Sequence, residues 1–197
     1  WLSASVRLPG PESDRLAEVA LERRVFICAA VYEVLPEFPG RFWNTAVLFD
    51  DRGDIVLRYR KLYAMTAKTR PGDVLDDWLT KFGPDSLFPV ASTRLGRLAA
   101  IVARDTHWPE VPRCLALRGA EILLNPMGAA RRTNAALQSG ADVARMARAY
   151  ENCVYIVAGN IGPFVGELNE PLRPPSEILD YTGRLMASGP SDSEGWI

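Results

Sequence analysis

Several short, almost continuously apolar runs constrain the fold of this 197-residue chain more than any other feature. A run of this kind, rich in strand-forming residues, is typical of a strand that is covered on both of its faces. Segments with helical spacing of apolar residues separate the later runs, and this alternation predicts an α/β fold built in layers. The strands expected from these runs cover residues 25–32, 98–103, 121–126 and 154–158.

Turn residues predict two antiparallel hairpins beside these strands. Residues 44–49 and 55–61 are joined by Asp50-Asp51-Arg52-Gly53-Asp54, which is a favourable hairpin turn. A second hairpin is expected over residues 176–188, turning at Tyr181-Thr182-Gly183. Four helices are expected. The first begins after Ser13 as its N-cap, the second covers 77–82, and the third runs from Pro109-Glu110 to Gly119. The fourth covers 134–152, with Val143, Ala147 and Tyr150 on one face.

Length and charge limit the possible classes of protein. We expect one domain over residues 1–197, incomplete at the N-terminus and also at the C-terminus. The 23 basic and 24 acidic residues nearly balance, which argues against nucleic acid or an anionic membrane as the main partner. No apolar run approaches the roughly 20 residues that a membrane span requires, and no signal peptide is visible.

Cysteine and histidine are too sparse for a disulfide framework or a metal site. Cys28, Cys114 and Cys153 lie far apart in apolar stretches, which predicts buried thiols in a reducing compartment and therefore a cytoplasmic protein. His107 is the only histidine, and the acidic residues form no spaced cluster. We therefore expect neither a metal nor another cofactor.

Three segments carry side chains that suit chemistry. Lys61 follows Tyr59-Arg60 at the end of an expected strand, where partial desolvation favours stabilisation of a negative charge. Over residues 96–110 a strand turns sharply into a helix, and such an elbow offers free backbone N–H groups to a developing oxyanion. The third segment is Asn125-Pro126, then Arg145 to Asn152 leading into residues 154–160, which is a helix that precedes a core strand. Each segment alone is also typical of ordinary α/β structure.

Together, in this order and spacing, the three segments closely resemble the nitrilase (carbon–nitrogen hydrolase) superfamily over nearly the whole chain. The matching residues are Asn44 with Tyr59-Arg60-Lys61, Asp105 with Trp108-Pro109-Glu110 and Arg113, and Arg148-Ala149-Tyr150-Glu151-Asn152 with Tyr155. The resemblance implies a four-layer αββα sandwich of the nitrilase type, whose N-terminal strand is missing from this chain. It also implies a homodimer, or a higher homo-oligomer, formed through the elbow helix and the later long helix.

The resemblance further implies a Cys-Glu-Lys triad that hydrolyses a non-peptide amide or a nitrile. Lys61 matches the lysine of this triad. Counting back from Asp105, the position of the nucleophilic cysteine is Ala103, and a methyl group cannot attack a carbon atom. The general-base glutamate is not in the chain, because the family places it upstream of all the matched residues.

Two explanations of Ala103 stay open, an engineered change and a natural loss. An engineered replacement of cysteine would leave the neighbouring positions intact. Here Arg104 stands where an aromatic residue is usual, and no glutamate lies between Lys61 and Pro71, where many members carry a supporting one. These further departures favour natural loss.

The elbow is expected to bind a small amide, nitrile or carboxylate, with loops 63–90 and 162–175 shaping the pocket. Beside the hydrolase hypothesis stands a naturally non-catalytic member that binds such a ligand or a partner protein, and a purely structural subunit is a third possibility. His107 is either an acid–base group or, as we favour, a histidine hydrogen-bonded at a helix start. The candidate ligand contacts besides Lys61 and Ala103 are Arg104, Asp105, His107, Trp108 and Asn125.

Overall fold

The computed structural model describes residues 1–64, 69–128, 140–161, 176–190 and 197, and every structural statement below refers to these residues. Within them the strands form two sheets. The three-stranded sheet is antiparallel and has the order β1 (Ile27–Glu33), β2 (Trp43–Phe49) and β3 (Ile55–Arg60). The six-stranded sheet has the order β4 (Ala91–Thr93), β5 (Gly96–Ala100), β6 (Ile122–Met127), β7 (Tyr155–Asn160), β8 (Glu177–Leu179) and β9 (Leu185–Ser188).

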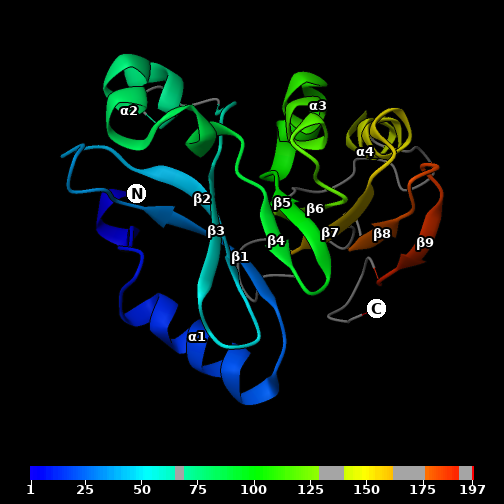
Figure 1. The fold of residues 1–197 in the computed structure, drawn as a ribbon, viewed down its shortest axis with the longest axis horizontal. Helices are drawn as coiled ribbons and strands as arrows, with labels where there is room; N and C mark the ends of the chain where they lie inside the picture. The colour runs from blue at the N-terminus through cyan, green and yellow to red at the C-terminus, as the bar shows by residue number, and fades with distance from the viewer. Residues whose placement is uncertain (65–68, 129–139, 162–175, 191–196) are drawn as a thin grey trace, which may run out of the picture.

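Helices cover the outer faces of both sheets, so the molecule has the four layers of an αββα sandwich, as predicted (Figure 1). Helix α1 (Pro11–Arg23) packs on the three-stranded sheet, while α3 (Glu110–Leu117) and α4 (Gly140–Asn152) lie against the six-stranded sheet. The remaining elements are α2 (Leu75–Phe82) and the short 3-10 helices η1 (Leu2–Ala4), η2 (Pro71–Val74), η3 (Pro84–Leu87) and η4 (Ala103–His107).

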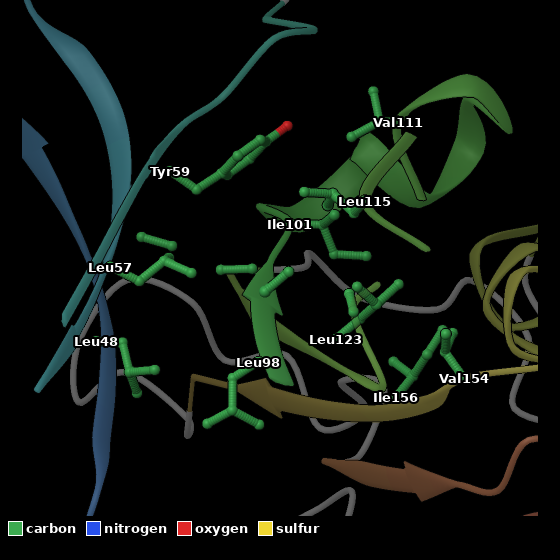
Figure 2. Close-up of a cluster of buried hydrophobic side chains, with 14 of the residues drawn as sticks. Leu48, Leu57, Tyr59, Leu98, Ile101, Val111, Leu115, Leu123, Val154 and Ile156 are labelled. Atoms are coloured by element: carbon green, nitrogen blue, oxygen red, sulfur yellow. The ribbon is translucent and has the colours of Figure 1, made fainter. Parts of the chain in front are cut away.

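Strand β2 explains why apolar runs in this chain are nearly continuous. Its side chains alternate between two cores, with Ala46 and Leu48 facing the second sheet and Val47 and Phe49 facing α1. Burial on both faces removes the polar positions that a half-exposed strand would show. Figure 2 shows the larger core cluster, with side chains of β2 and β3 on one side and side chains of β5, β6 and α3 on the other.

Strands β5, β6 and β7 pair in parallel, so their carboxyl ends meet at one edge of the six-stranded sheet. Crossover helices connect parallel strands of this kind, and α3 supplies the crossover between β5 and β6. Polar side chains collect at the carboxyl ends of strands in such sheets. The elbow that follows β5 lies at this edge.

Buried aromatic rings hold the end of β3, which leads into Lys61. Phe38, Trp43 and Trp78 form a separate apolar cluster. The Arg60 guanidinium lies 5.8 Å from the Trp78 ring centroid and makes two hydrogen bonds, of 2.7 and 2.8 Å, to the fully buried carboxylate of Glu33. The planar guanidinium can bond to the carboxylate and stack on the aromatic ring only in one orientation. These two interactions therefore restrict the backbone that carries Arg60.

Three local predictions need correction. Helix α1 begins at Pro11 after Gly10, and Ser13 is therefore not the N-cap but bonds back to the Gly10 N–H at 2.8 Å. Strand β1 is less buried than expected, because it lies at the edge of the described three-stranded sheet. Cys153 is exposed and so is not a buried thiol, whereas burial raises the pKa of the Cys28 thiol to about 12.

The long helix is observed from Gly140, while residues 129–139, which include the start of the predicted segment, lie outside the described residues. Its apolar positions Val143 and Tyr150 face away from the sheet. No helix in the described part of the chain is long and apolar enough to cross a membrane. The cytoplasmic location remains a prediction.

Candidate active site at the strand-to-helix elbow

The backbone bends sharply directly after β5. Ile101 and Val102 continue the direction of the strand, and Ala103 then adopts a left-handed conformation with φ of 48°. Residues Ala103–His107 form η4, and α3 follows after Pro109. A left-handed conformation costs an L-residue other than glycine about 1–2 kcal/mol, because its Cβ crowds the backbone. Strain of this kind recurs at functional sites, and Arg24 and Cys153 also have a positive φ among the described residues. Ala103 is the residue that the family resemblance assigns to the nucleophile's position.

Asp105 is the hub of the elbow. Its carboxylate is completely buried and accepts hydrogen bonds from the Tyr59 hydroxyl at 2.9 Å, the Val102 N–H at 3.0 Å and the Tyr63 N–H at 3.3 Å. Burial raises the pKa of Asp105, while the Lys61 charge and these hydrogen bonds act in the opposite direction. One side chain therefore connects the end of β3 to the backbone that follows β5.

Lys61 lies where the sequence predicts it, beside the elbow. Its side chain is nearly buried, with Nζ donating to the Val102 carbonyl and lying 3.7 Å from Oδ1 of Asp105. Burial lowers the pKa of Lys61, and the positive charge of Arg104 lowers it further, whereas Asp105 raises it. A partly desolvated ammonium stabilises nearby negative charge more strongly than a solvated one.

Asn125 approaches the elbow from the other side, on β6. Its side chain is fully buried, and its Nδ2 donates to the Ile101 carbonyl at 3.2 Å and to the Ala103 carbonyl at 3.3 Å. Its Oδ1 has no hydrogen-bond partner among the described residues. The direct ligand contact predicted for Asn125 remains a prediction, and the observed contacts are with backbone.

Three further candidate residues, Arg104, His107 and Trp108, line the outside of the turn. Arg104 is exposed. Trp108 is also exposed, and its ring stacks on that of Tyr63 with centroids 4.8 Å apart. His107 is half-buried, and its Nε2 is buried without a hydrogen-bond partner in the described part of the structure, so the predicted helix-start hydrogen bond is not seen at this atom.

Burial lowers the pKa of His107, and four positive charges lower it further. These charges belong to Arg104, Lys61, Arg145 and Arg148. The imidazole is therefore neutral near pH 7. The field around it is positive, which suits a negatively charged ligand.

Several contributing residues were not among the predicted site residues. Tyr59 and Tyr63 flank Lys61 in sequence, and only the structure shows that both bond to Asp105. Arg148, which belongs to the third sequence motif, donates to the Thr106 carbonyl at 3.0 Å and so connects α4 to the elbow. Arg145 is buried between Asp142 and Glu177, at 2.6 and 2.7 Å. Arg145 stands in the predicted helix three residues before Arg148, and no local pattern in the sequence predicts its burial.

Among the residues that the structure describes, no group of three or more His, Cys, Asp and Glu side chains could hold a metal ion. Lys61, Ala103, Asp105 and Asn125 are thus brought into one connected network, with Arg104, His107 and Trp108 around it.

Known proteins resemble this chain in both sequence and structure. A formamidase of Bacillus cereus strain B4264 is 30% identical over 160 residues, which are 81% of this chain and 44% of the formamidase. Saccharomyces cerevisiae Nit3, of the nitrilase superfamily, superposes with a TM-score of 0.71 at 17% identity, over 93% of this chain and 62% of its own. A cysteine-to-alanine mutant of the amidase from Nesterenkonia sp. AN1, in complex with butyramide, superposes with a TM-score of 0.68 at 24% identity, over 93% of this chain and 64% of its own.

The chain thus spans less than half the length of that formamidase and just under two thirds of those two structures. The family model for carbon-nitrogen hydrolase matches residues 1–197. With that match over every residue and the αββα fold in common with solved members, the chain belongs to the carbon–nitrogen hydrolase family of the nitrilase superfamily.

Proposed function

We propose that the elbow binds a small amide, nitrile or carboxylate, and that this chain cannot cleave it by cysteine chemistry because Ala103 occupies the nucleophile's position. The observation that carries the proposal is the strained backbone at Ala103, with φ of 48° and the Lys61 ammonium bonded to the neighbouring carbonyl. Strained backbone and a buried, desolvated charge are both common at functional sites, and here they lie next to each other.

The chemistry that the elbow would support is acyl transfer. In the family reaction, a cysteine thiolate attacks the amide carbon, and the C–N bond breaks as the amine leaves with a proton. Water then hydrolyses the thioester to the carboxylic acid. Lys61 suits stabilisation of the tetrahedral oxyanion, since its partly desolvated charge is held beside the elbow. The alanine methyl group provides no electron pair for the first step.

Relatives support the ligand class. The similar formamidases are named for a small amide, formamide. The Nesterenkonia amidase mutant is in complex with butyramide and has alanine in place of a cysteine. Ligand binding without the nucleophile is therefore compatible with this fold. We accordingly propose the elbow of this chain as a binding site for short amides or their acids.

Installing the nucleophile tests this proposal. In a version of the protein that includes the upstream general-base glutamate implied by the family resemblance, Ala103→Cys should release ammonia from formamide or butyramide. We expect a rate on the order of 10³-fold or more above the parent, since a missing nucleophile costs at least that much. Ammonia assays on the parent, on Ala103→Cys and on Ala103→Cys combined with Lys61→Met provide the measurement.

The control and the contradicting results are specific. Lys61→Met should abolish the gained activity, because the oxyanion would lose its stabilising charge. Circular dichroism of the variant checks that it is folded, since the substitution also removes the counter-charge of Asp105. Ammonia release by the unmodified parent would contradict the non-catalytic proposal. A folded Ala103→Cys variant without activity, together with a parent that binds neither butyramide nor butyrate, would contradict the ligand site itself.

A carboxylate is favoured over a neutral amide by the charges near His107. Arg104 is exposed, and the acid groups Asp142, Glu177 and Glu151 compensate Arg145 and Arg148. The charge of Lys61 is balanced by that of Asp105, whose Oδ1 lies 3.7 Å from the Lys61 Nζ in a buried pair. The positive charge exposed at the elbow is that of Arg104, and an anion would be drawn to it.

The single histidine makes this testable by NMR. We expect the His107 imidazole to titrate below its ordinary pKa of 6.5 in the free protein, since burial and positive charges oppose protonation. Butyrate should raise this pKa, because an added negative charge favours the imidazolium, whereas butyramide should change it less. A free-protein pKa at or above 6.5, or equal effects of the two compounds, would count against an anion site.

We also propose that the chain forms a homodimer through α3 and α4. Large apolar side chains on these two helices are exposed, with Leu117 at 79% and Tyr150 at 69% exposure, beside Val143 and Met146. The two helices pack against each other on the outer face of the sheet. Several large exposed apolar side chains on two neighbouring helices are typical of an interaction surface.

Charge insertion on that face should therefore split the dimer. Tyr150→Asp, or Leu117→Asp, should shift the protein from dimer to monomer in sedimentation velocity, because each buries a carboxylate at the interface. Leu21→Asp on α1 is the matched control, being 56% exposed on the opposite side of the sandwich. A monomeric parent, or a dimer lost equally in the control, would contradict the proposed surface.

A further inference from the structure

The hydrogen-bond ladder between β5 and β6 stops at a proline. The Ile101 N–H donates to the Leu124 carbonyl at 2.9 Å, which is the last backbone hydrogen bond of this parallel pair among the described residues. In a parallel ladder the next hydrogen bond would run from the N–H of residue 126 to the Ile101 carbonyl. Residue 126 is proline, which has no N–H. The sheet therefore offers no donor to the Ile101 carbonyl.

The side chain of the preceding residue supplies that donor. The Nδ2 of Asn125 lies 3.2 Å from the Ile101 carbonyl and 3.3 Å from the Ala103 carbonyl, and the side chain is fully buried. A primary amide carries two N–H donors, so one group can satisfy both carbonyls. The orientation of the amide is fixed, because its nitrogen, and not its oxygen, must face two acceptors.

Side chains thus replace the sheet as partners of the backbone at the elbow. Between the two carbonyls bonded by Asn125 lies Val102, whose N–H donates to Asp105 and whose carbonyl accepts from Lys61. The chain can leave the sheet at this point without burying unsatisfied backbone groups, which would cost about 1–3 kcal/mol each. The left-handed residue Ala103 follows directly.

From this geometry we infer that Asn125 and Pro126 act as one unit that sets the elbow. Pro126 ends the ladder with β5, and the Asn125 amide holds the freed carbonyls so that Ala103 stays in its left-handed conformation. Asn125 is therefore a positioning residue of the site, acting through the backbone of Ala103.

A double-mutant cycle on Asn125 and Pro126 tests whether the two residues act together where the β5–β6 hydrogen bonds end. Pro126→Ala restores an N–H that can donate to the Ile101 carbonyl, so Asn125 should matter less in that background. In the parent, Asn125→Ala should raise the unfolding equilibrium constant about tenfold or more, as expected for loss of a buried donor. In the Pro126→Ala background the increase should be at least threefold smaller, measured by denaturant unfolding. Equal increases in the two backgrounds would overturn the inference.

The backbone at residue 103 gives a second measurement. In the parent, Ala103→Gly should lower the unfolding constant, by severalfold, because glycine adopts φ of 48° without the Cβ penalty. With Asn125→Ser, Ala103 should relax from the left-handed region, and its three-bond amide–α-proton coupling and Cα chemical shift should change. If Asn125→Ala does not fold, Ala103→Gly in the parent still tests the inference. An unfolding constant of Ala103→Gly higher than that of the parent would contradict a strained elbow that its contacts hold in place. If the amide–α-proton coupling and the Cα shift of Ala103 are unchanged in Asn125→Ser, the inference that Asn125 positions the elbow is also overturned.

Ligand binding provides a third measurement, which rests on the proposed function. Asn125→Ser should weaken binding of butyrate at least tenfold, while Pro126→Ala, which keeps the amide, should weaken it less than threefold. Comparable weakening by both variants would overturn the positioning role. If the parent binds neither butyrate nor butyramide, the proposed function fails, and the unfolding and NMR measurements still decide the inference about the elbow.

Discussion

The elbow depends on the buried carboxylate of Asp105. This one side chain accepts hydrogen bonds from segments that belong to different sheets. Tyr59 and Tyr63 donate from the end of β3, and Val102 donates from the segment that follows β5. The carboxylate also lies beside the ammonium of Lys61. A buried carboxylate is tolerated only when such donors and a counter-charge surround it. The contacts of Asp105 therefore hold the lysine beside the strained turn at this end of the six-stranded sheet.

The surrounding structure is built to keep that arrangement rigid. Arg60, next to Lys61, is bonded to buried Glu33 and lies over Trp78, so the strand that carries the lysine has little freedom. On the opposite side, Asn125 holds the carbonyls on either side of Val102. Preorganised groups of this kind stabilise developing charge without rearrangement during a reaction. The same preorganisation would serve a ligand that is only bound.

Much of this arrangement could be predicted from the sequence, where local chemistry or motif spacing determined it. The turn Asp50–Asp54 fixes the first hairpin, and Gly53 has φ of 82° and lies against the Ala17 carbonyl, where a Cβ would approach to 2.7 Å. The position of Lys61 beside the elbow followed from three motifs in register. The αββα layers followed from the resemblance and from the apolar runs, which β2 explains through burial on both faces.

Other features depend on contacts between segments far apart in the sequence. Tyr59 and Asp105 are hydrogen-bonded across 46 positions, a partnership that no local pattern encodes. The role of Asn125 requires the register of β5 against β6, since only that register shows which donor Pro126 removes. Ser13 matches the N-cap preference, but the helix begins at Pro11, three residues earlier than expected, because proline is preorganised for the first turn. Composition alone also could not show that Cys153 is exposed at a positive φ.

The most direct test of the account is the free energy of unfolding of Asp105→Asn at pH 7, compared with that of the parent. The amide keeps the size of the side chain but removes the charge opposite Lys61 and turns one acceptor into a donor facing other donors. We expect a loss of about 3–5 kcal/mol, as for breaking a buried ion pair. Asp51→Asn, which breaks only a surface pair with Arg94, should cost less than about 1 kcal/mol. A loss for Asp105→Asn no larger than that of this control would contradict the central role of the buried carboxylate.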